Sequence, residues 1–100
     1  MSYSDFCNLL GLGLRAGKYE LGSMACEKAA KRGRLFLLLL DESSAPRTIK
    51  NYHSLCQENG VELLMMPPGS FQAQTGFAYQ VVGVKDEQFA KALIDKMNRP

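Results

Sequence analysis

The sequence has no apolar run that could cross a membrane as a helix. Its longest strictly apolar run covers residues 35–40 and has six residues, whereas a membrane-spanning helix needs about 20. The first five residues also lack the basic start and long apolar stretch of a secretory signal peptide. We therefore expect no membrane partner for this chain.

Cysteine is scarce as well. The three cysteines, Cys7, Cys26 and Cys56, are odd in number and widely spaced. A small secreted domain held together by disulfides usually has an even and denser set. The pattern therefore predicts reduced thiols and a cytoplasmic protein.

The chain is short and nearly neutral. One hundred residues exclude an eight-fold β/α barrel, which needs roughly 200 residues or more, and we predict a single domain over residues 1–100. Twelve basic and ten acidic residues leave a net charge of +2, which by itself does not indicate nucleic acid. The stretch from Arg15 to Arg34, however, holds six bases and two acids. Such a local face could meet a phosphate backbone, and the alternative is a solvated helix face.

Apolar periodicity predicts helices that alternate with strands. Strands are expected over residues 35–40, 61–66 and 79–84, and a further short strand could lie near 19–21. Alternation of this kind implies a mainly parallel or mixed sheet with helices on both faces. We therefore predict an α/β fold, a three-layer α/β/α sandwich.

Start and stop signals bound the predicted helices. A first helix ends at Gly17, a second covers about residues 23–32 and ends at Gly33, and a third ends at Asn59-Gly60. A short helix runs through residue 75, and a last helix follows residue 86. The side chains expected to cap helices are Ser4 or Asp5, Ser43 or Ser44, Ser70, and Asp86.

The same patterns predict which helix faces are buried. In the second helix the buried side is expected to hold Leu21, Met24, Ala25 and Ala29. In the third helix the core stripe is expected to hold Ile49, Tyr52, His53 and Cys56, which makes His53 a core histidine with partial exposure.

The candidate catalytic patterns are weak. The glycine-rich segment 11–18 lacks the glycine spacing, the Ser or Thr after the lysine and the preceding strand of a phosphate loop. His53 and Cys56 are two ligands only and do not complete a zinc site. The pair Asp41-Glu42 follows a buried strand, where α/β folds often place active-site acids, but adjacent carboxylates more often mark a helix start. The sequence therefore favours a binding protein over an enzyme.

One set of spaced residues resembles a known family. The pattern Gly17-Lys18-x3-Gly22-Ser23-x4-Lys28-x3-Arg32-Gly33, followed by the apolar strand and Asp41-Glu42, is similar to the bacterial ribosomal-protein "L-seven-Ae-like" family of the YlxQ type. The resemblance continues through residues 56–61 and 86–90 and covers nearly the whole chain. It implies a four-stranded mixed sheet in an α/β/α sandwich. It also implies a non-enzymatic protein without cofactor or metal that binds structured RNA, ribosomal or kink-turn RNA, in association with the ribosome; no DNA partner is expected.

The resemblance also implies where RNA would bind. The second helix would meet the RNA with its N-terminus, where Gly22 permits a close turn and the hydroxyl and N–H of Ser23 can meet a phosphate. A loop further along the chain would form a second contact with an extruded base or the backbone. The residues implied in RNA binding are Lys18, Gly22, Ser23, Met24, Lys28, Arg32, Gln74, Thr75, Gly76 and Phe77.

The positions after Ser23 differ from the family pattern. Many kink-turn binders carry Asn-Glu there, whose side chains reach sheared G·A pairs, whereas this chain has Met24-Ala25. Apolar side chains cannot make those hydrogen bonds, so direct readout of bases is expected to be reduced. The alternative function is a protein-interaction or regulatory module that kept the fold without kink-turn readout.

Overall fold

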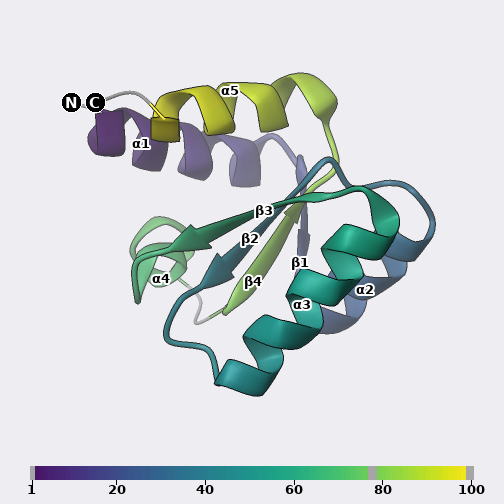
Figure 1. Ribbon diagram of the computed structural model, residues 1–100. Coiled ribbons are helices and arrows are strands. Elements are labelled where there is room, and N and C mark those ends of the chain that lie inside the picture. The colour runs from purple at the N-terminus through teal and green to yellow at the C-terminus, as the bar shows by residue number, and fades with distance from the viewer. Residues whose placement is uncertain (1, 77–78, 99–100) are drawn as a thin grey trace.

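The computed structural model describes residues 2–76 and 79–98. A four-stranded mixed sheet lies between two layers of helices, which confirms the predicted α/β/α sandwich (Figure 1). Within the described residues, no helix is both long and apolar enough to span a membrane. The elements are α1 (Ser2–Arg15), β1 (Tyr19–Leu21), α2 (Ser23–Lys31), β2 (Leu37–Asp41), α3 (Pro46–Asn59), β3 (Glu62–Met66), α4 (Ser70–Thr75), β4 (Val81–Val84) and α5 (Glu87–Asn98).

The strand order in the sheet is β1-β4-β2-β3. β2 and β3 are parallel, whereas β4 is antiparallel to both of its neighbours, β1 and β2. α3 connects the parallel pair, as a crossover between parallel strands requires. β2 is therefore a central strand, as its continuous apolar run predicted.

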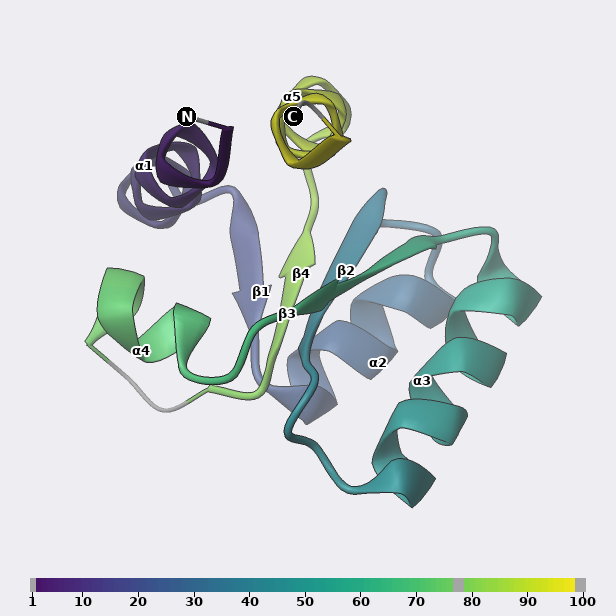
Figure 2. The same ribbon diagram turned by 60° about the vertical axis from the view of Figure 1, so that its left-hand side comes forward.

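Side chains of β2 alternate between the two faces of the sheet. Leu37 and Leu39 join a core with α1, α4 and α5, whereas Leu38 and Leu40 join a second core with α2 and α3. Figure 2 shows α2 and α3 together on one face and α1 and α5 on the other. All four leucines are fully buried, so the strand is apolar on both sides because helices cover both.

Most of the predicted side-chain caps are wrong. α1 already begins at Ser2, so Ser4 and Asp5 lie within it. The N-cap residue of α3 is Ala45 and that of α4 is Gly69, and neither helix has a side-chain cap. Ser43 instead donates its hydroxyl to Asp41. Asp86 is confirmed as a cap, because its Oδ1 accepts the Phe89 N–H at 2.8 Å.

Two predicted buried faces are confirmed only in part: Ala29, Tyr52 and Cys56 are buried as predicted, whereas Met24 and His53 are not. In α2 the buried residues are Cys26, Ala29 and Ala30, whereas Met24 is 82% exposed. The helix faces the sheet with the i, i+3, i+4 row of small side chains, which turns Met24 toward solvent. His53 is exposed on α3, where only Tyr52 and Cys56 are buried.

Gly13 is needed for packing, which explains part of the glycine-rich segment 11–18. A Cβ atom at Gly13 would collide with the rings of Tyr19 and Phe89. The Tyr19 hydroxyl donates to the Leu10 carbonyl at 2.7 Å, so the ring lies directly against α1. This glycine allows close contact between a helix and a strand and is part of no phosphate loop.

Candidate nucleic-acid interface

The candidate interface begins at the junction of β1 and α2. Gly22 has φ +88° and ψ 165°, a backbone conformation essentially restricted to glycine. Its N–H donates to the Val81 carbonyl at 3.2 Å. This bond fixes the start of α2 beside the first residue of β4.

The first turn of α2 is open to solvent. No side chain caps it, and Ser23 and Met24 are exposed. The first N–H groups of a helix have no partners within the helix, and the dipole adds a partial positive charge there. Together with the Ser23 hydroxyl, this turn has the donors that a phosphate oxygen needs.

Two cations lie further along the chain, Lys28 within α2 and Arg32 at its C-cap. Lys28 and Arg32 are exposed, and they line one shallow surface pocket of about 130 Å³ with Glu20, Ala25, Ala29 and Arg34. Side chains four residues apart are neighbours on a helix surface. The structure therefore brings Lys28 and Arg32 together, as their spacing predicted.

Lys18 lies apart from Ser23. Its ammonium forms an ion pair with the Asp86 carboxylate at 3.0 Å, and its carbonyl accepts the Lys85 N–H. These contacts place Lys18 at the opposite end of β1 from Gly22, and three residues of strand span about 10 Å. The two predicted contact points are therefore separated by the length of β1.

The second predicted contact lies at the end of α4. Gln74 and Thr75 are the last residues of this helix, and Gly76 ends it with φ +76°. Phe77 lies outside the described residues. The chain then enters β4 through Gln80, whose carbonyl accepts the Asp41 N–H at 2.8 Å. Because Gly22 is bonded to the next residue, Val81, the chain leaving α4 enters the sheet beside the start of α2.

Asp41 connects the loop that follows β2 with the loop that follows β3, at the end of the sheet where both strands finish. One carboxylate oxygen accepts the N–H and the hydroxyl of Ser43 at 2.8 and 2.5 Å, and the other accepts the Gly69 N–H at 3.0 Å. Burial disfavours the charged form, but the three hydrogen bonds outweigh burial and hold the pKa of Asp41 below its ordinary value. The Asp41-Glu42 pair is therefore no helix-start signal, since α3 begins only at Pro46.

The buried thiols do not have the character of nucleophiles. Desolvation raises the pKa of Cys26 to about 12 and that of Cys56 to about 11, and only thiolates react readily. His53 is exposed whereas Cys56 is buried, so the two do not face one common ligand. Across residues 2–76 and 79–98, no three metal-ligating side chains gather in one place.

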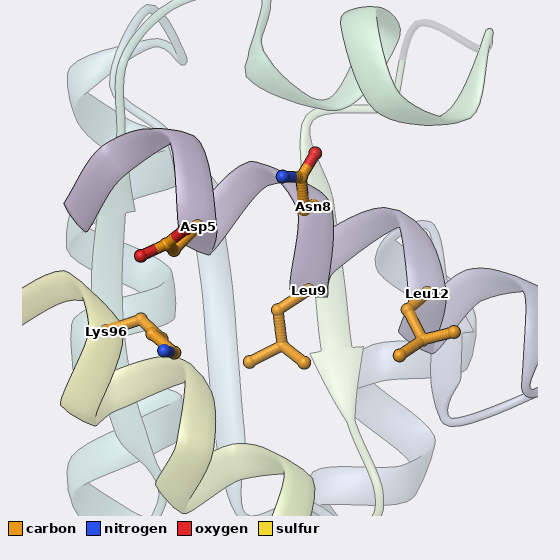
Figure 3. A pocket seen from close by; sticks show the side chains of 5 residues that line it. All are labelled: Asp5, Asn8, Leu9, Leu12 and Lys96. Atoms are coloured by element: carbon orange, nitrogen blue, oxygen red, sulfur yellow. The ribbon is translucent and has the colours of Figure 1, made fainter. Parts of the chain in front are cut away.

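A separate pocket lies between α1 and α5 (Figure 3). It has a volume of about 300 Å³ and is lined by Asp5, Asn8, Leu9, Leu12 and Lys96. Leu9 points into the space between the helices, and Asp5 lies across from Lys96. This pocket belongs to the layer on the other side of the sheet from α2, so it is no part of the candidate interface.

Comparisons with known proteins establish the fold. The structure is similar to a protein of unknown function from Bacillus halodurans, with a TM-score of 0.87 and 24% sequence identity over 94% of this chain and 97% of the other. It is also similar to a 15.5kD RNA binding protein from Giardia lamblia, with a TM-score of 0.77 and 13% identity over 95% and 83% of the two chains. No protein-family model and no curated protein matches the sequence.

Sequence reasoning missed three residues near the end of α2. Arg34, Phe36 and Lys85 line a pocket of about 410 Å³ with Glu20 and Gly33. Phe36 was hidden within the apolar run 35–40, but its side chain is 41% exposed. No local signal could have found it, because Leu35 and Leu37 are buried in two different cores and Phe36 precedes the first residue of β2 within an unbroken apolar run.

Proposed function

We propose that this chain is a non-enzymatic, single-domain RNA-binding protein that holds structured RNA against the exposed face of α2. The observation that carries the proposal is the uncapped first turn of α2, with Ser23 exposed, on the same helix as the exposed cations Lys28 and Arg32. Helix N–H groups and cations are the groups that bind a phosphate backbone. The fold shared with an RNA-binding protein supports the assignment.

The RNA class rests on the resemblance of the sequence to kink-turn binders. The expected ligand is a kink-turn or related bent ribosomal RNA, since the first turn of α2 and the segment 74–77 would contact the two sides of a bend. Lys28 and Arg32 would meet phosphates, and Lys18 would contribute only after leaving Asp86. Met24, 82% exposed, offers apolar contact in place of hydrogen bonds, so affinity is expected to depend on RNA shape more than on base identity.

A salt titration of RNA binding tests the proposal. Fluorescence anisotropy would compare a kink-turn RNA with a straight duplex of equal length. Lys28→Ala and Arg32→Ala should each weaken binding to both RNAs and reduce the slope of log K against log salt by about one. Lys91→Ala is the matched control, because Lys91 is an exposed lysine on α5. Failure to bind either RNA at low salt, or a slope unchanged in Lys28→Ala, contradicts the proposal.

The exposure of Met24 favours a second candidate, a protein-interaction module at the same place. Methionine is one of the residues enriched in the cores of protein–protein interfaces. The absorbance ratio at 260 and 280 nm of freshly purified protein distinguishes the two candidates. A protein partner that copurifies without nucleic acid, and is lost in Met24→Ala, would support the second.

A further inference from the structure

We propose that the surface of Glu20, Gly33, Arg34, Phe36 and Lys85, here called the Phe36 platform, binds an unpaired nucleotide of an RNA strand that continues beyond α2. The base would stack on the Phe36 ring, and its phosphate would lie against Arg34, beside Lys85, which offsets the charge of Glu20. This inference rests on the proposed RNA-binding function and extends it to a second, single-stranded contact.

The backbone holds Phe36 rigidly outward. Gly33 turns the chain with φ +71°, and the Arg34 N–H donates to the Ala29 carbonyl at 2.9 Å. The Phe36 N–H then donates to the Val84 carbonyl at 2.9 Å. Its neighbour Leu35 is buried and packs so closely on Gly83 that a Cβ there would lie 2.8 Å from it. The exposed ring therefore lies on a segment tied to the sheet, as a stacking surface requires.

The charges around the ring favour a polyanion. Arg34 and Lys85 line the platform, and Glu20 is its only carboxylate. Glu20 is already paired with Lys85 at 3.5 Å, whereas no ion pair among the described residues involves Arg34. An arginine without a carboxylate partner beside an exposed aromatic ring can contact a phosphate while the base stacks.

The platform is continuous with the α2 cations. Arg34 and Glu20 also line the pocket that contains Lys28 and Arg32, so basic side chains follow one another from Lys28 to Lys85. A helix of nine residues spans about 13 Å. The RNA strand would cover this distance from the first turn of α2 to the Phe36 platform.

The opposite side of Phe36 disfavours RNA. The neighbouring pocket, of about 240 Å³, contains Glu62, Glu87 and Lys91 beside Phe36. Lys91 is paired with Glu87 at 3.9 Å, which leaves the carboxylate of Glu62 to repel phosphates. Phe36 thus separates a basic pocket from an acidic one, so the RNA strand would reach the ring from the side of Arg34 and Lys85. Unpaired nucleotides fit best, because bases within a duplex cannot stack on a side chain.

The test measures what a single-stranded extension adds to binding. Anisotropy titrations would use two RNAs with the same kink-turn, one blunt and one with a six-uridine extension. The wild type should bind the extended RNA about tenfold more tightly than the blunt one, the gain expected for one stacked base. Phe36→Ala should abolish the gain and leave the affinity for the blunt RNA unchanged, and Phe36→Tyr should restore it. Arg34→Ala should also reduce the gain, but because Arg34 lines the pocket of Lys28 and Arg32 as well, it should weaken binding of the blunt RNA too.

Leu12→Ala is the matched control, since Leu12 is 48% exposed on α1, and it should keep the full gain. The proposal is overturned if the extension adds nothing to wild-type binding, or if Phe36→Ala keeps the gain. It is also overturned if Phe36→Ala weakens the binding of both RNAs equally. Competition by an acidic peptide but not by free oligouridine would also overturn it, in favour of a protein ligand. If the wild type fails to bind even the blunt RNA, the proposed function itself fails.

Discussion

At the scale of single residues, Asp41 shows how one side chain shapes the candidate interface. It accepts hydrogen bonds from Ser43 in the next loop and from Gly69, 28 residues later in the chain. The segments that follow β2 and β3 are therefore held together by one buried carboxylate. The sequence placed an acid at the end of a buried strand but could not name its partners, because Gly69 is remote and contributes only a backbone N–H.

We predict that Asp41→Asn lowers the free energy of unfolding at pH 7 by about 1–3 kcal/mol, because it weakens hydrogen bonds to a charged acceptor. The pKa of Asp41 is lower in the folded protein than in the unfolded chain. Its contribution is therefore complete above pH of about 4 and is lost as the pH falls through the folded-state pKa. Urea unfolding between pH 7 and pH 2 should show that the free energy of unfolding falls less with acid in the variant than in the wild type.

Glu58→Gln is the control for this experiment, because Glu58 is an exposed carboxyl on α3. It should change the free energy of unfolding by less than about 0.5 kcal/mol at pH 7. Equal acid sensitivity of Asp41→Asn and the wild type would show that the carboxylate does not hold the loops.

At the scale of elements, the bounds of the helices were predicted better than the residues on their buried faces. The range of α2 differed from the prediction by a single residue at its end, because Gly22 and Gly33 bound it on both sides. Its buried face was predicted correctly at Ala29 but wrongly at Met24, because Met24 and Cys26 are both plausible core residues. Only the packing of α2 on the sheet decides which of the two side chains is buried. The small side chains of Cys26, Ala29 and Ala30 let the helix lie closer to the sheet.

The start of α5 carries a prediction on capping. Asp86 accepts the Phe89 N–H and the Lys18 ammonium, which together hold its pKa below the ordinary value. We expect Asp86→Ala to lower the melting temperature clearly, because both contacts are lost. Asp86→Asn should lower it much less, since asparagine also caps helices and an exposed ion pair contributes little.

Thermal unfolding followed by circular dichroism would measure these differences. Lys18→Ala separates the two contacts, because it removes the ion pair and keeps the cap, and it should behave like Asp86→Asn. A loss in Lys18→Ala as large as that in Asp86→Ala would show that the ion pair dominates.

At the scale of the whole molecule, two cores share one sheet. Leu38 belongs to the core under α2 and α3, whereas the adjacent Leu39 belongs to the core under α1, α4 and α5. Any loss of β2 exposes both cores to water. The candidate interface on α2 therefore depends on the packing of the helices on the far side of the sheet.

We predict that Leu38→Ala and Leu39→Ala each lower the free energy of unfolding by about 2–5 kcal/mol, the usual cost of a cavity in a core. Each variant should still unfold in a single transition, with coincident curves from far-ultraviolet circular dichroism and tyrosine fluorescence. Leu12→Ala, on the exposed side of α1, should change stability far less. Two separate transitions in Leu38→Ala would show that the α2 and α3 layer unfolds independently.

The sequence by itself determined the type and order of the longer elements, whereas the short strand β1 was only one possibility near residues 19–21. Alternating periods of 3.6 and 2 residues and the glycines at helix ends are local properties, and the apolar run of β2 already required helices on both faces. The spacing of Ser23, Lys28 and Arg32 also indicated one basic helix surface, because that spacing is fixed by the helix itself.

Only the tertiary structure decided which side chains meet across the chain. It exposed Met24 and His53, paired Lys18 with Asp86, and tied Asp41 to Gly69. It also turned Phe36 outward beside Arg34 and Lys85. These contacts join segments that are distant in sequence, and their geometry depends on how helices dock on a sheet, which no local pattern of residues contains.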